Sequence, residues 1–302
     1  MLYFSQMKKH LKTILAPIIF AATIIAFIYY INGHPETLRQ LANISPYALL
    51  LMLLLSAVSF GIYMLITHIS LHMYQKSMSL QEGFLFNSYS SLINFFGPGQ
   101  SGPIFRAAYL KKRHNVTVKQ FTFVLLMYLG FLAVISAMFM FVGSRPWWQT
   151  VLLMVAAGAV SALFIWRYRR RANLTLSSGF SALNIGLLFV ATALQLGILV
   201  LLYGLELQQI GADASWGQVL SYTGVSNFSI FVALTPGAIG IREAFLVFSQ
   251  NLHHITTSDI VAANLLDRGM YLIFLGLMFV LVVSLHAKEK LGINKSPGAS
   301  AP

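Results

Sequence analysis

The sequence predicts an all-α polytopic membrane protein with about six transmembrane helices and two re-entrant helical hairpins. Of its 302 residues, 57% are hydrophobic and only 9% are charged, whereas a soluble domain carries roughly 25% charged residues. Five uncharged runs reach or exceed the ~20 residues that a helix needs to cross the hydrocarbon core. These runs are residues 13–31, 47–67, 121–144, 147–166 and 172–205. Two more apolar segments are interrupted by glycine and proline, and each of them predicts a hairpin.

The placement of the basic residues predicts the orientation in the membrane. The formal net charge is +12, and most Lys and Arg residues cluster at the ends of apolar runs. Cytoplasmic loops carry such an excess, and it sets orientation. Threading the chain accordingly places 15 of the 20 Lys and Arg residues in the cytoplasm and only Arg39 and Arg145 outside. We therefore expect a multi-pass protein of the cell membrane (inner or plasma) with both termini in the cytoplasm.

The motifs and the charge pattern also narrow the class of partner and ligand. Basic clusters beside apolar runs are typical topology signals near anionic headgroups, so we expect membrane lipids and no nucleic acid as partners; homo-oligomerisation stays open. There is no cysteine and no HExxH, GxSxG or phosphate-loop motif. His68 and His72 share a helix face but have no third ligand nearby. We therefore predict no metal site, no cofactor and no catalytic residues.

We expect one transmembrane domain, residues 13–286, between a cytoplasmic N-terminus at 1–12 and a cytoplasmic, partly disordered tail at 287–302. The first apolar run is interpreted as a retained span, because it exceeds the roughly 7–15 residues of a signal-peptide h-region. The fifth span, about residues 180–204, is expected to end before an outer loop that carries Glu206 and Asp213. The spans are expected at about residues 13–31, 46–67, 120–142, 147–166, 180–204 and 260–285.

The two broken segments, about residues 84–105 and 216–241, carry the same Pro-Gly-x-x-Gly motif 138 residues apart. Glycine permits an open turn, while proline stops one helix and can start the next. The predicted threading brings the segments in from opposite sides, so that the halves 46–142 and 180–285 form an inverted repeat. Many transporters bind substrate at such a repeat interface. The turn residues are Pro98, Gly99 and Gly102 in the first copy and Pro236, Gly237 and Gly240 in the second.

An alternative is that the two turns are packing kinks, whose glycines allow helices to approach closely. Asn94 and Asn227, which lie in the broken segments, likewise have two interpretations. They could bind a lipid headgroup, or they could satisfy backbone groups that the breaks leave without helical partners. The pair His253-His254 could sense pH or cap a loop.

Ionisable residues lie in or beside the broken segments and the last span, where charged groups are costly and usually functional. We predict that they bind the substrate, with the arginines near the turns recognising an anion together with the positive N-terminal ends of the following helices. Adjacent helix positions point about 100° apart, so pairs are expected between segments, Arg268 with Glu243 and Asp267 with Arg242 or Arg106. The structural alternative is an ion pair that only locks span six to the hairpin. The predicted site residues are Arg106, Arg242, Glu243, Asp267 and Arg268.

At these residues the sequence resembles the transmembrane region of bacterial lysylphosphatidylglycerol synthases, also described as flippase-like integral membrane proteins. The resemblance rests on the first motif with Arg106, on the late motif Pro-Gly-Ala-Ile-Gly-Ile-Arg-Glu-Ala at 236–244, and on Arg268. The family often has an acidic residue where this chain has Pro103. In two-domain members this region is similar to a lipid flippase and is joined to a cytosolic aminoacyl-transferase domain. We expect that domain to be absent here, because the chain ends about 17 residues after its last span.

The resemblance implies a flippase-like transporter for an anionic or modified phospholipid or a lipid-linked glycan, in which Arg106 and Arg242 bind phosphate. It argues against lipid synthesis by this chain. One alternative is a non-catalytic partner of a membrane glycosyltransferase or lipid-modifying enzyme. A less favoured one is an intramembrane enzyme that acts on lipid headgroups, with Asp267 or Glu243 as base; no nucleophile–base pair supports it.

Overall fold

The computed structural model of the chain describes residues 43–96, 101–142, 147–173, 178–232 and 241–290. Within these ranges the chain forms helices and no strands. The predicted first span and all the turn residues except Gly102 lie outside the described residues, as do the expected N-terminus at 1–12 and positions 291–302 of the tail.

Five helices are long and apolar enough to cross a membrane, and they confirm five of the predicted spans. Most continue beyond their apolar run, because a helix does not have to end where its first charged residue occurs. The helix that begins at Trp147, for example, was expected to end at residue 166 but continues through four arginines. The five helices are α3 (Pro46–His72), α6 (Val118–Phe141), α7 (Trp147–Ala172), α8 (Ala182–Gln209) and α12 (Thr257–Lys290).

Short polar signals start several of these helices. Ser45 caps α3 by accepting a hydrogen bond from the Ala48 N–H, and Pro46 occupies the first turn, where its missing N–H costs nothing. Thr117 caps α6 and Ser215 caps the later helix α9, each in a reciprocal capping box with a glutamine three residues on. The sequence therefore specifies these helix starts locally, before any tertiary packing.

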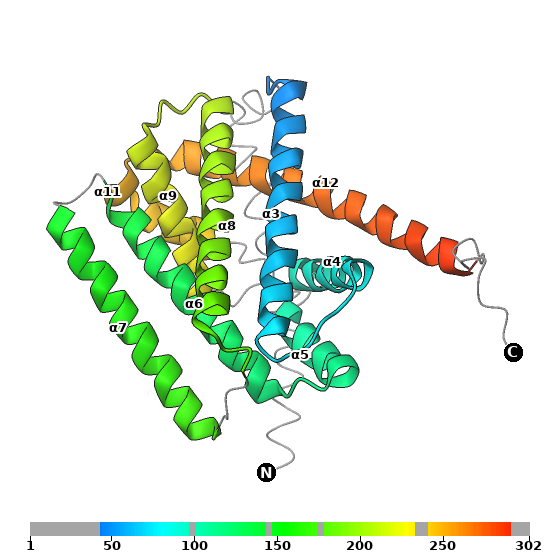
Figure 1. The fold of residues 1–302 in the computed structure, drawn as a ribbon. Helices are drawn as coiled ribbons and strands as arrows, with labels where there is room; N and C mark the ends of the chain where they lie inside the picture. Colours follow the sequence, from blue (N-terminus) through cyan, green and yellow to red (C-terminus); the bar gives the residue numbers. More distant parts are fainter. Residues whose placement is uncertain (1–42, 97–100, 143–146, 174–177, 233–240, 291–302) are drawn as a thin grey trace, which may run out of the picture.

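The long helices form a bundle that one helix crosses (Figure 1). α3 and α8 pack side by side and run in opposite directions, while α6 packs against both α7 and α8. α12 passes behind α8 and α3 at a steep angle, and its C-terminal part extends away from the bundle. The largest buried cluster includes Met52, Tyr222, Leu246 and Ile260, which come from four different helices. The first and last long helices, α3 and α12, therefore share one core.

Each broken segment folds as a pair of antiparallel helices. In the first, Ser101 donates to the Ile93 carbonyl and Tyr109 donates to Glu82. In the second, Ser221 donates to the Leu252 carbonyl, and the rings of Phe228 and Phe245 stack. We name the first pair hairpin one and the second pair hairpin two. Hairpin one consists of α4 (Leu80–Phe96) and α5 (Ser101–His114), and hairpin two of α9 (Trp216–Phe228), the 3₁₀ turn Ser229–Val232, α10 (Ile241–Phe248) and α11 (Gln250–His253).

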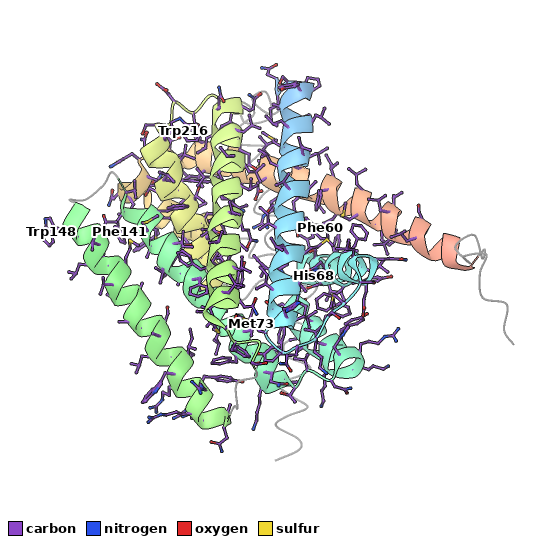
Figure 2. The ribbon with its side chains drawn as sticks, in the orientation of Figure 1. Phe60, His68, Met73, Phe141, Trp148 and Trp216 are labelled. Carbon is purple, nitrogen blue, oxygen red and sulfur yellow. The ribbon has the colours of Figure 1, made fainter. Side chains whose placement is uncertain are left out.

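The two hairpins start from opposite ends of the long helices. α4 follows the end of α3 that carries Met73, whereas α9 starts at the other end, where Trp216 lies (Figures 1 and 2). Trp148, at the start of α7, lies toward the same end as Trp216. This is the arrangement that an inverted repeat requires. The inverted repeat, and the re-entrant position of the hairpins in a membrane, stay predictions.

The links that follow the two hairpins have the same local structure, which supports the internal repeat. Asn115 and His254 both adopt a left-handed backbone, with φ of 55° and 56°. The next residue of each link, Val116 or Ile255, is buried. The residue after that is a threonine whose hydroxyl accepts a hydrogen bond from a backbone N–H three residues on, at the start of α6 or α12.

Candidate functional site

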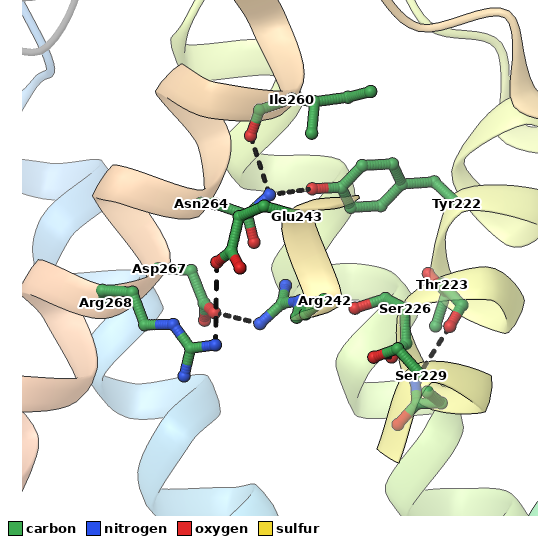
Figure 3. A network of polar contacts seen from close by, with 11 residues as sticks. Tyr222, Thr223, Ser226, Ser229, Arg242, Glu243, Ile260, Asn264, Asp267 and Arg268 are labelled. Atoms are coloured by element: carbon green, nitrogen blue, oxygen red, sulfur yellow. Dashed lines mark hydrogen bonds and ion pairs between the residues drawn. The ribbon is translucent and has the colours of Figure 1, made fainter. Parts of the chain in front are cut away.

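The charged residues of hairpin two and span six form one largely buried group. Arg242 and Glu243 start α10, and Asp267 and Arg268 face them from α12 (Figure 3). Arg242 Nη1 lies 2.5 Å from Asp267 Oδ2, and Arg268 Nη2 lies 3.8 Å from Glu243 Oε1. These are two of the pairings expected from the sequence. Because adjacent residues on α12 point apart, each one meets a different residue of α10.

The ion pairs use only part of the hydrogen-bonding capacity of Arg242. Its side chain is buried, with the residue 7% exposed, and its guanidinium carbon lies 4.9 Å from the ring centre of Tyr203 on α8. Nε and Nη2 have no hydrogen-bond partner among the residues that the structure describes. Buried guanidinium donors are normally satisfied, so Arg242 has two donor nitrogens with which to bind a further acceptor.

Glu206 belongs to the same group, although the sequence interpretation placed it in an external loop. That expectation is wrong, since α8 continues to Gln209 and the residue is only 1% exposed. The charged neighbours of its carboxyl group are Asp267, Arg242 and Arg268. One feature of the sequence could have indicated this position. Glu206 lies three residues after Tyr203, so both side chains lie on one face of α8.

Neutral polar side chains line the rest of hairpin two. Asn264 on α12 donates to the Ile260 carbonyl at 2.7 Å and to the Tyr222 hydroxyl at 3.3 Å (Figure 3). Asn227 donates to the Thr223 carbonyl, one turn back on its own helix. Asn227 thus bonds to a carbonyl inside its own helix, which is neither of the two roles expected from the sequence, and Tyr222 connects α9 to the charged helix α12.

Arg106 occupies a separate site in hairpin one. It is 8% exposed, donates from Nε to Ser90 Oγ and from Nη2 to Asn87 Oδ1, both at 2.7 Å. Thr67 on α3 donates to the same Asn87 oxygen at 3.0 Å. The guanidinium stacks on Tyr63 of α3, with its carbon 4.1 Å from the ring centre. Within the described part of the chain Arg106 makes no ion pair, so the alternative pairing with Asp267 does not form.

A small cavity lies beside Arg106. It has a volume of about 60 Å³, and α3, α5 and α6 line it with Tyr63, Thr67, Arg106 and Tyr128 among others. A water molecule occupies roughly 30 Å³ of liquid volume, so the cavity is large enough for a small polar group but not for a whole lipid. The Arg106 charge therefore borders free space inside the protein.

Gly102 holds the two helices of hairpin one together. Its N–H donates to Asn94 Oδ1 at 3.3 Å. A Cβ atom at this position would lie 2.7 Å from the Asn94 Cβ and 3.0 Å from the Ser90 carbonyl oxygen, closer than real Cβ contacts allow. Asn94 and Gly102 thus serve packing and backbone satisfaction at the turn, and this close approach keeps Ser90 beside Arg106.

The two arginine sites are built from the same kinds of residue. Each arginine lies on the second helix of its hairpin and stacks on a tyrosine of the preceding long helix. The first helix of each hairpin carries a buried asparagine that donates to the carbonyl four residues back. The matching residues are Tyr63 and Tyr203, Asn87 and Asn227, and Arg106 and Arg242. The repeat noticed in the glycine turns therefore extends to the polar interior.

Comparison with known proteins agrees with the resemblance seen in the sequence. The family described as the lysylphosphatidylglycerol synthase TM region matches residues 14–278, which is most of the chain. No curated protein matches the sequence. The matched residues contain both hairpins, both arginine sites and the ion pairs of α12. The chain therefore belongs to the lysylphosphatidylglycerol synthase transmembrane-region family.

Proposed function

We propose that the protein is a flippase-like transporter that translocates an anionic or modified phospholipid, or a lipid-linked glycan. The family is a membrane domain of lipid-related proteins, which supports a role that involves membrane lipids. The match covers the transmembrane region of that family and is compatible with a chain that has no enzymatic activity.

The observation that carries the proposal is the matched pair of buried arginines. A charged side chain at membrane depth is costly and normally faces a partner or a polar pathway. Here each hairpin supplies one, and each stacks on a tyrosine of the preceding long helix. Two equivalent arginines on opposed hairpins suit a cargo whose anionic headgroup is passed from one side to the other.

Arg106 is the better first contact for a phosphate. Its bonded partners are neutral and it borders a cavity, so an anion can approach without displacing a carboxylate. Arginine suits this role because its planar group binds phosphate oxygens through two parallel N–H bonds.

Arg242 would take part in a later step, because Asp267 already offsets its charge. A phosphate that binds there would compete with Asp267 or use the two donor nitrogens, Nε and Nη2, that have no partner among the described residues. Glu243, Asp267 and Arg268 would then exchange partners while the hairpin moves. The long Arg268–Glu243 contact, 3.8 Å, is the weaker of the two pairs and the easier one to exchange.

The test is lipid movement in proteoliposomes, followed by quenching of fluorescently labelled phosphatidylglycerol in the outer leaflet. Arg106→Gln and Arg268→Gln should slow this movement at least about tenfold, since a charge-assisted hydrogen bond contributes roughly 1.5–3 kcal/mol. The matched control is Arg169→Gln, which replaces an exposed arginine near the end of α7. A labelled lipid that lacks phosphate should not be moved.

Equal rates for wild type and both site variants would refute the transporter assignment. If purified protein moves no lipid but copurifies stably with a membrane glycosyltransferase or lipid-modifying enzyme, the partner alternative is supported instead. Thermal unfolding in detergent, measured on each variant, separates a lost site from a lost fold.

A further inference from the structure

Glu206 presents a chemical problem that the ion pairs do not solve. The residue is 1% exposed, and neither carboxyl oxygen has a hydrogen-bond partner among the described residues. An ionised carboxylate in that position would forgo its hydration without replacement, which is strongly unfavourable in a low-dielectric interior. Either Glu206 carries a proton or it holds a cation.

The neighbouring groups favour a proton. Asp267 is the charged neighbour that acts most strongly on the carboxyl group of Glu206. Two ionised carboxylates repel each other, whereas a proton on Glu206 gives it an O–H group that can donate a hydrogen bond. A bound proton therefore supplies the donor that Glu206 lacks and removes the repulsion in the same step.

The groups that face Glu206 come from several helices. Arg242 lies on α10, Asp267 and Arg268 on α12, Tyr203 on α8 itself and Tyr222 on α9. The five acids and arginines of the group, Glu206, Asp267, Glu243, Arg242 and Arg268, have a formal charge of −1 when all are ionised. One proton makes the group neutral, which suits an apolar surrounding.

A metal cation would fit this place less well. Sodium, calcium and magnesium prefer several oxygen ligands arranged around them, and two guanidinium groups already lie beside these carboxyls. A proton needs only a single lone pair on one oxygen. The residues around Glu206 therefore suit a proton better than a metal cation.

We propose that Glu206, beside Asp267, binds and releases one proton, and that this proton is coupled to cargo movement. The coupling rests on the proposed lipid transport. In the binding step a hydronium ion gives its proton to a carboxylate oxygen of Glu206: one O–H bond of hydronium breaks, one O–H bond on Glu206 forms, and a water molecule leaves. In the arrangement of the structure, with Asp267 paired to Arg242, Glu206 holds the proton because burial denies its carboxylate hydration; when hairpin two moves with its cargo and opens this group to water, the carboxylate is hydrated and the proton is released to water.

Proton binding is measured first, without any lipid assay. Infrared difference spectroscopy of the purified full chain during pH titration should show a protonated-carboxyl C=O band. Glu206→Gln should remove that band, whereas Asp213→Asn, which changes an exposed carboxylate after α8, should retain it. A titration that is identical in wild type and Glu206→Gln would overturn the proton site, because Gln has no carboxyl group to protonate.

Coupling is measured next, in proteoliposomes with labelled phosphatidylglycerol and an imposed gradient. With one proton per lipid, a tenfold proton gradient should give about tenfold accumulation of lipid in one leaflet. Glu206→Gln should abolish this accumulation, and Asp213→Asn should keep it. Accumulation that persists in Glu206→Gln, or that follows a sodium gradient instead, would overturn the coupling. If wild type moves no lipid at all, the transport proposal and its coupling fail, while the infrared titration still decides the proton site.

Discussion

Hairpins one and two each carry a buried arginine, and the two arginines have different electrostatic surroundings. Arg106 is held by an asparagine and a serine, which are neutral, and it borders a cavity. Arg242 is held by Asp267, with Glu206 and Glu243 close by. The two halves therefore share a framework of glycine turn, tyrosine and arginine but differ in the acids around it. One site is cationic at rest, and the other becomes cationic only when Asp267 is neutralised or moves.

The largest expected effect comes from Arg242→Met. The change leaves Asp267 buried beside Glu206 without its guanidinium partner, and the loss of one member of a buried pair costs about 3–5 kcal/mol. The free energy of unfolding in detergent should fall by that amount. The double variant Arg242→Met with Asp267→Leu should recover most of the loss, because it removes both charges. If the double variant is as unstable as the single one, the destabilisation comes from packing and not from charge.

A smaller effect is expected from Arg106→Met, the matched change in hairpin one. In this variant Asn87 Oδ1 still accepts a hydrogen bond from Thr67, but Ser90 Oγ loses the bond that Arg106 donates. The free energy of unfolding should therefore fall by about 1–3 kcal/mol. The same unfolding assay measures it. If Arg106→Met and Arg242→Met lower the free energy of unfolding by the same amount, the acids around Arg242 do not make that site different from the Arg106 site.

The two hairpins also differ near the end of their last helix, where His114 and His253 occupy equivalent positions. In hairpin one, His114 Nε2 lies 2.9 Å from Glu82. Burial alone would raise the pKa of Glu82, but hydrogen bonds from Tyr109 and His114 outweigh it and hold that pKa below 4.5. In hairpin two, burial lowers the pKa of His253 below 6.5. The Ile255 N–H donates to its Nδ1, which leaves Nε2 to donate to the Leu246 carbonyl.

Acidification should therefore loosen hairpin two before hairpin one, the smallest of the expected effects. Both pKa values are lower in the folded state, so both stabilising contributions are complete above the ordinary pKa and are lost as pH falls. The loss begins below 6.5 for His253 and below 4.5 for Glu82. Hydrogen exchange, corrected for its intrinsic pH dependence, should show early loss of protection in α10 and α11. His253→Gln should remove that early loss; simultaneous opening of both hairpins would contradict the assignment.

Hydropathy predicts the long helices well because lipid imposes one simple requirement, a sufficiently long apolar run. Five spans lie where the sequence placed them, and each broken segment belongs to a pair of helices, although the second helix of each pair extends beyond the predicted ends at 105 and 241. The pairings of Arg242 with Asp267 and of Arg268 with Glu243 were also predictable, since a buried charge needs an opposite charge on another segment. The roles of Asn94 and Asn227 were not predictable, because the same side-chain amide can bind a lipid headgroup or satisfy a backbone group.

Glu206 shows where such reasoning fails. A carboxylate at the end of an apolar run looks like the start of a loop, because hydropathy measures composition and not the neighbours that a side chain meets. Its burial depends on α12, whose Asp267 lies 61 residues later in the chain. Only the crossing of α8 by α12 shows that this acid faces the interior.

The crossing of α12 also links the two hairpins mechanically. Asp267 contacts α10 of hairpin two, and Tyr271, one turn further along, contacts Phe95 at the end of α4 with ring centres 5.5 Å apart. An α-helix bends little over a single turn, so α12 works as a rigid strut between these contacts. A movement of one hairpin must either carry the other with it or break one of the two contacts, so that under the proposed transport, binding at one arginine site would be felt at the other.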